Sequence, residues 1–281
     1  RQDSNPGRVR MSLGGVGRNI AHNMALLGLD VRMITALGDD VYAQKITTSC
    51  IELGIDLAHS LQVPGASTST YLFLTDEKGD MELAVSDMEI YDHLTPQFLA
   101  GKEPLLNNAR LVICDTNIPE PTLAWIASHC KAPVFVDPVS TAKAVKVKPV
   151  LGRLHTLKPN RIEAELLSGV AITGDESLAR CADALLSTGL HRVFISLGGD
   201  GVYAADYQGG RIKVPCGTAK MVNTTGCGDA FMAALAWGWL EGLGLEEAAR
   251  AGLAASAIAM EGTETINPEL TAAAVRARAG L

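Results

Sequence analysis

Short apolar runs alternate with helical segments through the middle of the chain, and polar residues appear where each run stops. The runs are residues 111–114, 134–136, 156–157 and 193–195. Apolar strands of this length, separated by helices, build a parallel sheet. Ligands of such sheets bind outside the ends of the strands. The sequence therefore predicts an α/β fold with a site at the polar strand ends.

Composition restricts the class of partner. The chain has 281 residues, 47% of them hydrophobic, which suffices for a large core in one domain or in one domain with a small appendage. Its net charge of −7 argues against nucleic acid and against an anionic membrane surface as partners. Six cysteines without a C-x-x-C pair fit a reducing cytosol and no zinc site. No apolar run approaches the roughly 20 residues that span a bilayer. We expect a cytoplasmic protein that acts on a small molecule.

A glycine-rich loop precedes an apolar helix near the C-terminus. Residues 222–231 read VNTTGCGDAF, and the apolar stretch 230–240 follows. Gly226 and Gly228 let backbone N–H groups converge at the positive end of the helix dipole, which predicts an anion site. A carboxylate would repel a phosphate there, so Asp229 makes sense as a base that takes a proton from an attacking hydroxyl. Asp is also a favoured helix N-cap, and on this stretch alone the two interpretations weigh about the same.

A second glycine cluster opens a helix near the N-terminus. Residues 14–28 read GGVGRNIAHNMALLG, with Asn19 near the start of the helix. Glycines beside an Asn could admit a sugar close to the backbone and bind its hydroxyls. A dinucleotide-binding loop needs a buried strand directly before it, whereas residues 8–13 alternate like an exposed strand. A purely structural tight turn remains the third interpretation.

Two β-rich segments interrupt the alternation of strands and helices. Residues 67–75 and 81–86 are joined by DEKGD at 76–80, which predicts a hairpin. With the strand at 8–13 it could form a small sheet that covers the site as a lid, although an exposed hairpin with ordinary Ser and Thr would look the same. The side chains that this lid could offer to a ligand are Thr68, Thr70 and Asp87.

Further elements follow from caps and periodicity. Residues 31–36 predict a strand, and Asp40 can cap a helix that ends before Gly54. Residues 245–260 and 268–279 predict two C-terminal helices.

Two weaker signals lie at strand ends. Asn160 and Glu163 are one helical turn apart, so both could face a hydrated Mg²⁺. The same spacing is that of a capping box, which alone would be the preferred interpretation. The glycines of 198–201 either let a nucleotide approach the backbone or form a hairpin turn before residues 202–205.

Three motifs together resemble the ribokinase-like, phosphofructokinase-B type carbohydrate kinase family. They are GGVGRN from Gly14, N-x-x-E from Asn160 and NTTGCGDAF from Asn223, and the resemblance covers essentially the whole chain. Within the family, SNPG, FVDPVSTAK, HTLKPNRIEAE and SLGGDGVY most resemble the bacterial pseudouridine kinases. The resemblance implies a three-layer α/β sandwich around a parallel sheet, with a small β lid. The sandwich would comprise residues 14–62 and 91–281, and the lid residues 1–13 and 63–90.

The resemblance also implies a reaction: ATP would phosphorylate the 5′-hydroxyl of pseudouridine, with Asp229 as the base. Glu163 and Asn160 would organise Mg²⁺ through water, and family members commonly use a monovalent cation such as K⁺ and pair as homodimers through their lids. The anion hole would be the amides of Gly226, Cys227 and Gly228, and the ribose would face Gly14, Gly15 and Asn19. Candidates near the base are Thr68, Thr70, Asp87 and Asn117. The nucleotide side would be Asn160, Ser196, Gly199, Gly201, Ala255 and Ile258.

Two departures from the family pattern bear on these expectations. Cys227 stands where Ala is usual, and because only its backbone N–H is used, we expect little loss. Family members also begin with an apolar strand ending in an Asp that grips the sugar, whereas only thirteen residues precede Gly14 here. Because loss of a central strand would leave backbone groups unpaired, we expect the biological chain to begin upstream.

Three alternatives to a pseudouridine kinase remain open from the sequence. The first is another ribokinase-like sugar or nucleoside kinase, of the ribokinase, fructokinase, adenosine or uridine/cytidine type. The others are a nucleotide-binding oxidoreductase and a kinase-like binding protein without turnover.

Overall fold

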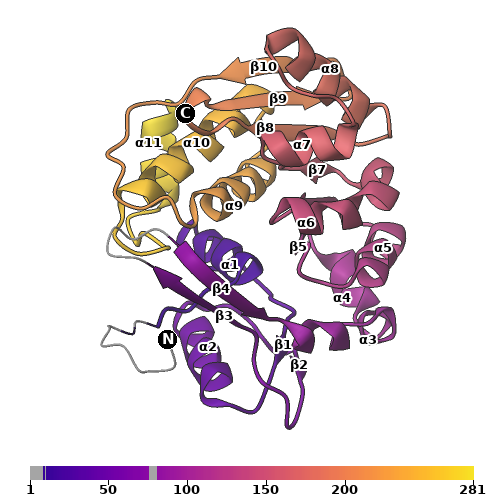
Figure 1. Ribbon diagram of the computed structural model, residues 1–281, viewed down its shortest axis with the longest axis vertical. Helices are drawn as coiled ribbons and strands as arrows, with labels where there is room; N and C mark the ends of the chain where they lie inside the picture. The colour runs from indigo at the N-terminus through magenta and orange to yellow at the C-terminus, as the bar shows by residue number, and fades with distance from the viewer. Residues whose placement is uncertain (1–8, 10, 76–80) are drawn as a thin grey trace.

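A six-stranded sheet forms the centre of the computed structural model, which describes residues 9, 11–75 and 81–281 (Figure 1). Strands β5 to β8 are parallel to one another, β9 is antiparallel to β8, and β10 is antiparallel to β9. The α/β architecture expected from the sequence is confirmed, although the sheet is mixed. The spatial order is β10 (Arg211–Val214), β9 (Val202–Asp206), β8 (Arg192–Ser196), β7 (Thr156–Leu157), β6 (Val134–Asp137) and β5 (Val112–Asp115).

Helices cover both faces of this sheet and complete a three-layer sandwich (Figure 1). Side chains alternate along each strand, so Val134 and Val136 of β6 enter one core and Phe135 enters the other. Because both faces are covered, the strands read as continuous apolar runs. One face carries α5 (Glu120–His129), α7 (Arg161–Ser168) and α8 (Asp175–Leu186), and the other α1 (Val16–Leu26), α9 (Cys227–Leu240), α10 (Leu245–Glu261) and α11 (Ala272–Ala279).

The helix α9 is apolar around most of its circumference because it packs between α1 and α10. Its residues from Asp229 to Gly238 are all buried. This packing fixes the N-terminal end of α9 beside the first turn of α1.

A β-hairpin projects from the sandwich, as predicted. Strands β3 (Thr70–Thr75) and β4 (Met81–Asp87) pair antiparallel, and the predicted turn at 76–80 lies outside the described residues. The same part of the sequence also forms α2 (Val41–Glu52) and the parallel pair β1 (Ala36–Leu37) and β2 (Leu61–Gln62). Asp40 caps α2 as predicted, its Oδ1 accepting from Ala43 N at 2.8 Å.

Two predicted strands differ from the structure. Of residues 31–36 only Ala36 belongs to a strand. Arg32 forms an isolated bridge with Asp56, and regular pairing with the same segment begins only at Ala36, which is the register partner of Leu61. Residues 9 and 11–13 are not in a strand, and residues 8 and 10 lie outside the described residues. The division into a sandwich domain and a lid domain stays a prediction.

Short elements complete the described chain. They are η1 (Glu89–His93), α3 (Pro96–Ala100), α4 (Glu103–Asn108), α6 (Thr141–Ala144), η2 (Val145–Arg153) and η3 (Gly198–Asp200). Within the described ranges, no helix is both long enough and apolar enough to cross a membrane.

Candidate active site

Two segments that lie far apart in the sequence meet at the N-terminal end of α9. Asn19 Nδ2 of α1 donates a hydrogen bond of 2.8 Å to Asp229 Oδ2, and both side chains are buried. The N-cap residue of each helix is a glycine with positive φ, 97° at Gly15 and 84° at Gly226. The two predicted glycine loops therefore converge on one carboxylate.

Burial raises the pKa of Asp229 to about 7. Loss of hydration is the main cause; the hydrogen bond from Asn19 acts in the opposite direction, and the nearby Asp137 carboxylate raises the pKa further. The N-cap of α9 is Gly226, so the N-cap interpretation of Asp229 is wrong. A carboxylate with this pKa can accept a proton near neutral pH and release it again.

The loop before Asp229 requires glycine. A Cβ on Gly226 would lie 2.4 Å from Thr265 O, and its φ is positive. Gly228 is exposed, which leaves room for a ligand at the helix N-terminus. The Cys227 thiol is half-buried, and burial raises its pKa, which disfavours the reactive thiolate.

A buried ion pair, which the sequence analysis missed, lies beside this loop. Lys158 Nζ is 3.0 Å from Asp137 Oδ2, and both side chains are under 10% exposed. Desolvation alone would lower the pKa of Lys158, but Asp137 and the neighbouring carboxylates hold it above its usual value. A Cβ on Gly228 would lie 3.4 Å from Lys158 Nζ, so the ammonium faces the glycine loop. The signal that could have identified both residues is their position at the ends of β6 and β7.

The predicted magnesium pair forms a complete capping box. Asn160 Oδ1 accepts from Glu163 N, and Glu163 Oε2 accepts from Asn160 N, each at 2.9 Å. The capping interpretation is thus confirmed, and a role toward Mg²⁺ stays a prediction. In the described part of the chain, no group of three or more His, Cys, Asp or Glu side chains converges on one point. These residues fit a Mg²⁺ ion that would be held mainly by phosphates and water, with Glu163 reaching the ion through water.

The predicted nucleotide residues lie in three parts of the fold. Ser196 N donates to Pro159 O at 2.9 Å, and a parallel bridge joins Ser196 to Asn160, so these two predicted residues lie together. Gly201 lies in the connection between the antiparallel strands β8 and β9, which confirms the hairpin interpretation for this glycine. Its φ is 95°, and a Cβ there would lie 2.0 Å from Val214 O. Ala255 and Ile258 are buried against α9, so core packing accounts for them. The nucleotide contacts of all of them, and of exposed Gly199, stay predictions.

The predicted lid residues are only partly on the hairpin. Thr68 is buried before β3, where its Oγ1 donates to Asp40 Oδ1 and accepts from Gly38 N. Thr70 and the exposed Asp87 are register partners at the base of the hairpin.

Asn117 belongs to a polar network that reaches the first glycine loop. Asp115 Oδ2 accepts from Gly17 N, and Asp115 Oδ1 accepts from Asn117 N, each at 2.8 Å. Lys143 Nζ donates to Asn117 Oδ1. Gly14 is exposed ahead of this loop, with nothing within 4 Å of the position of a Cβ.

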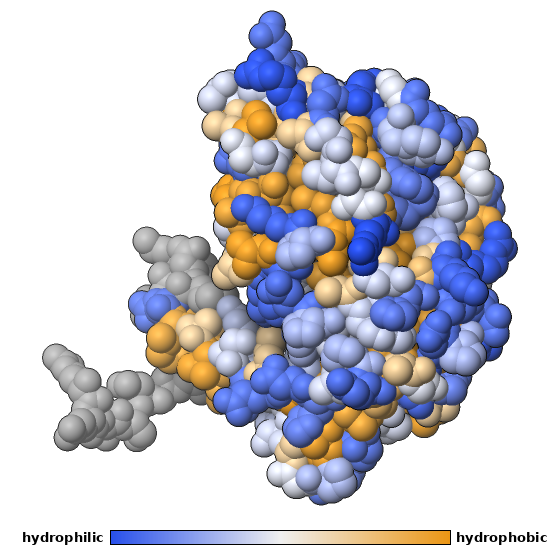
Figure 2. Space-filling view, turned by 90° about the vertical axis from the view of Figure 1, so that its right-hand side faces the viewer, coloured by the Kyte–Doolittle hydropathy of each residue, from blue (hydrophilic) through white to orange (hydrophobic). Residues whose placement is uncertain are grey.

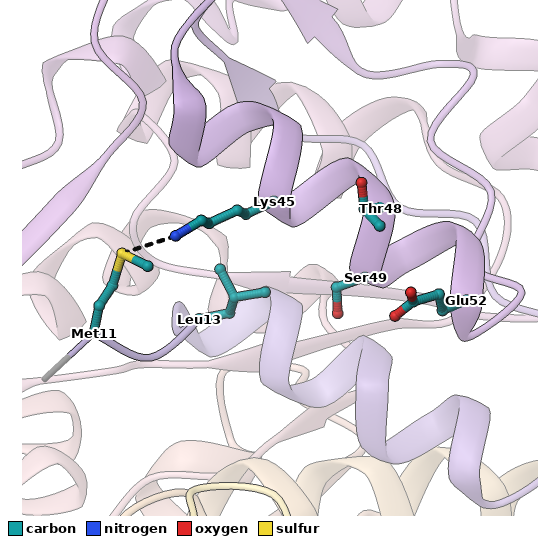
Figure 3. A pocket seen from close by; sticks show the side chains of 6 residues that line it. All are labelled: Met11, Leu13, Lys45, Thr48, Ser49 and Glu52. Atoms are coloured by element: carbon teal, nitrogen blue, oxygen red, sulfur yellow. Dashed lines mark hydrogen bonds between the residues drawn. The ribbon is translucent and has the colours of Figure 1, made fainter.

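A surface pocket between residues 11–13 and α2 is separate from the residues described above. Figure 3 shows the side chains that line it, with Lys45 directed toward Met11. None of the predicted site residues lines this pocket. Its lining is Met11, Leu13, Lys45, Thr48, Ser49 and Glu52.

Comparisons with known proteins agree with this geometry. The model of the pfkB family of carbohydrate kinases matches residues 1–272. The chain is 44% identical to the pseudouridine kinase of Escherichia coli K12, over 97% of the chain and 88% of that protein. It is 37% identical to the uncharacterized sugar kinase YeiI of the same strain, over 96% of the chain and 75% of that protein.

Among solved structures, the ribokinase of Thermotoga maritima has the same fold. Its TM-score is 0.81 at 24% identity, over 99% of this chain and 93% of that chain. The fold is thus ribokinase-like. The chain belongs to the pfkB family of carbohydrate kinases and is a phosphotransferase.

Proposed function

We propose that the protein transfers a phosphoryl group from ATP to the 5′-hydroxyl of pseudouridine, giving pseudouridine 5′-phosphate and ADP. The observation that carries the proposal is the hydrogen bond between Asn19 and Asp229, which unites the sugar loop and the anion loop around one base. The 44% identity to a pseudouridine kinase supports the choice of nucleoside.

Asp229 accepts the proton of the attacking hydroxyl in this mechanism. The backbone amides of Gly226, Cys227 and Gly228, at the positive end of α9, stabilise the charge on the transferring phosphoryl group. The ammonium of Lys158 faces the same loop and adds to that stabilisation. Asn160 and Glu163 would hold Mg²⁺ through water, and the ion supplies charge neutralisation at the phosphates.

Asn19 provides a further reason to place a sugar here. Its Oδ1 is buried and has no hydrogen-bond partner among the described residues. A buried acceptor without a donor is costly, and a sugar hydroxyl is the kind of donor that would satisfy it.

A monovalent cation and a homodimer are finer parts of the proposal. Backbone carbonyls of the loop at 263–265 lie against the anion loop: Thr265 O is close to Gly226, and Thr263 O accepts from Asn223 Nδ2. Carbonyl oxygens of this kind suit K⁺. Exposed apolar side chains on the hairpin support pairing of two copies through the lid.

The second candidate is another sugar or nucleoside kinase of the same family. The 37% identity to a protein named as a sugar kinase favours it, because the shared motifs specify phosphoryl transfer better than they specify the base. Membership of the family leaves no support for the oxidoreductase alternative.

Coupled ADP release with pseudouridine, uridine, ribose and fructose separates the two candidates. We expect the highest kcat/KM with pseudouridine. Equal or better turnover of a free sugar would reject the pseudouridine assignment and favour the second candidate.

A further inference from the structure

Lys143, in α6, is a lysine near the site that the phosphoryl chemistry leaves without a role. Its half-buried side chain donates to Asn117 Oδ1, and its Nζ lies 3.4 Å from Met88 Sδ. A thioether sulfur is a weak acceptor, whereas an ammonium has three donors. Within the described ranges, Asn117 is therefore the one strong acceptor bonded to this ammonium, which retains donor capacity for a ligand.

The position of Lys143 relative to the base follows from the polar network. Lys143 bonds to Asn117, Asn117 bonds to Asp115, and Asp115 accepts from Gly17 at the start of α1. Two residues further along the same helix, Asn19 bonds to Asp229. Lys143 thus stands at the end of this chain of contacts opposite to Asp229.

The parts of a nucleoside bound for 5′-phosphorylation follow the same order as this chain of contacts, starting from Asp229. Its 5′-hydroxyl faces the catalytic base, its ribose follows, and its nucleobase is the part farthest from the reacting oxygen. With the hydroxyl at Asp229 and the ribose at the glycine loop of α1, the nucleobase reaches the side where Asn117, Lys143 and Met88 meet. Met88 directly follows β4, so this end also connects to the hairpin.

We propose that Lys143, oriented by Asn117, is a specificity-determining residue that donates a hydrogen bond to a carbonyl oxygen of a uracil-type base. This inference rests on the proposed function. A uracil ring carries two carbonyl oxygens, whereas adenine carries none and free ribose has no base. Lys143 thus favours nucleosides with a carbonyl-bearing base over adenosine and over free sugars.

Lys146 offers a matched control in the neighbouring turn. Its Nζ donates to Thr116 O and Ile118 O at 3.0 Å each, on the same strand-end loop that carries Asn117. It is half-buried like Lys143, but its donors serve the backbone. Loss of Lys146 should therefore affect stability without changing base preference.

The test compares wild type, Lys143→Met and Lys146→Met, because methionine has a similar length and no charge. Calorimetry without ATP measures the Kd of pseudouridine, uridine, adenosine and ribose, and steady-state assays give kcat and KM. For Lys143→Met we expect pseudouridine and uridine to bind about 10- to 100-fold more weakly, as for one lost charged hydrogen bond. The Kd of ribose and the kcat with pseudouridine should stay close to wild type. Lys143→Arg, which keeps a charged donor, should recover part of the affinity.

Two results would overturn the inference while leaving the proposed function intact. One is an unchanged Kd of pseudouridine in Lys143→Met. The other is an equal weakening of ribose and pseudouridine, which would make Lys143 a structural residue like Lys146. If the wild-type protein fails to phosphorylate pseudouridine, the proposed function is rejected, and the assignment of Lys143 is rejected with it.

Discussion

At the residue scale, the chemistry depends on how burial perturbs Asp229. Its pKa of about 7 in the folded protein means that the reactive, ionised form accumulates only as the pH rises through neutrality. We expect kcat/KM to increase with pH and to level off above a midpoint near 7, because kcat/KM reports the ionisation of the free enzyme. A pH–rate profile of the wild type measures this midpoint.

Asn19→Ala tests the cause of that midpoint. The hydrogen bond from Asn19 stabilises the ionised carboxylate, so its removal should move the ascending limb of kcat/KM to higher pH. A midpoint that stays in place in Asn19→Ala would show that Asp229 is not the titrating group. A wild-type midpoint near 4 would contradict the rise in the pKa of Asp229 on burial.

A second prediction at the residue scale concerns Lys158. Loss of one partner of a buried ion pair typically costs about 3–5 kcal/mol, so Lys158→Met alone is expected to be unstable. The double variant Lys158→Met, Asp137→Asn removes both charges and should remain folded. We expect its kcat to fall about 10²- to 10³-fold, as for loss of one donor to the transferring charge. A folded double variant with wild-type kcat would remove Lys158 from the mechanism.

At the element scale, the conformation of the anion loop depends on Gly226. Gly226 and Gly28 have nearly the same φ, 84° and 83°, but only at Gly226 would a Cβ meet another backbone atom. Both Gly226→Ala and Gly28→Ala incur the left-handed penalty of roughly 1–2 kcal/mol. Only Gly226→Ala should lose kcat and show the larger drop in melting temperature. Equal effects of the two substitutions on kcat would mean that the loop geometry does not matter for transfer.

Helix caps and turns could be predicted because their signals are local in the sequence. The cap at Asp40, the capping box at Asn160 and the hairpin after Thr70 depend on residues close in sequence, and each is present. The bond between Asn19 and Asp229 joins residues 210 positions apart, so only the fold could place it. The ion pair of Lys158 was missed for the same reason, since its partner lies on the neighbouring strand.

At the scale of the whole molecule, the hairpin of β3 and β4 has little packing support from the other elements. Figure 2 shows hydrophobic surface on the part that projects from the main body. Isolated two-stranded hairpins are marginally stable in water, so exposed apolar residues on this one favour contact with a second copy. The large apolar side chains that are 50–58% exposed there are Tyr71, Leu72, Phe73, Leu74, Leu83 and Val85.

Light scattering coupled to size-exclusion chromatography tests that contact. We expect the wild type to elute as a dimer and the double variant Leu72→Lys, Leu74→Lys to elute as a folded monomer. These two side chains share one face of the hairpin, because residues two apart in a strand point the same way. A monomeric wild type, or a variant that stays dimeric, would contradict pairing through this face.

The overall topology was predictable only in part. The parallel strands could be predicted from the sequence because helices cover both faces of the sheet, so that each strand is a fully apolar run. The antiparallel pairing of β9 remained ambiguous, because glycines such as Gly201 serve equally well in a turn or beside a nucleotide. The substrate could not be predicted from the pattern of residues, because a lysine such as Lys143, which we propose as a donor to the base, has no local sequence signal that distinguishes it from a surface lysine.

The most direct test of the account is the turnover number of Asp229→Asn with pseudouridine and ATP. The variant keeps the shape of the side chain and avoids burial of a charge, so it should fold at least as well as the wild type above pH 7. The account predicts that kcat falls by roughly 10²- to 10⁴-fold, as for loss of a positioned base, while the affinity for ATP stays nearly unchanged. A kcat close to that of the wild type would contradict it.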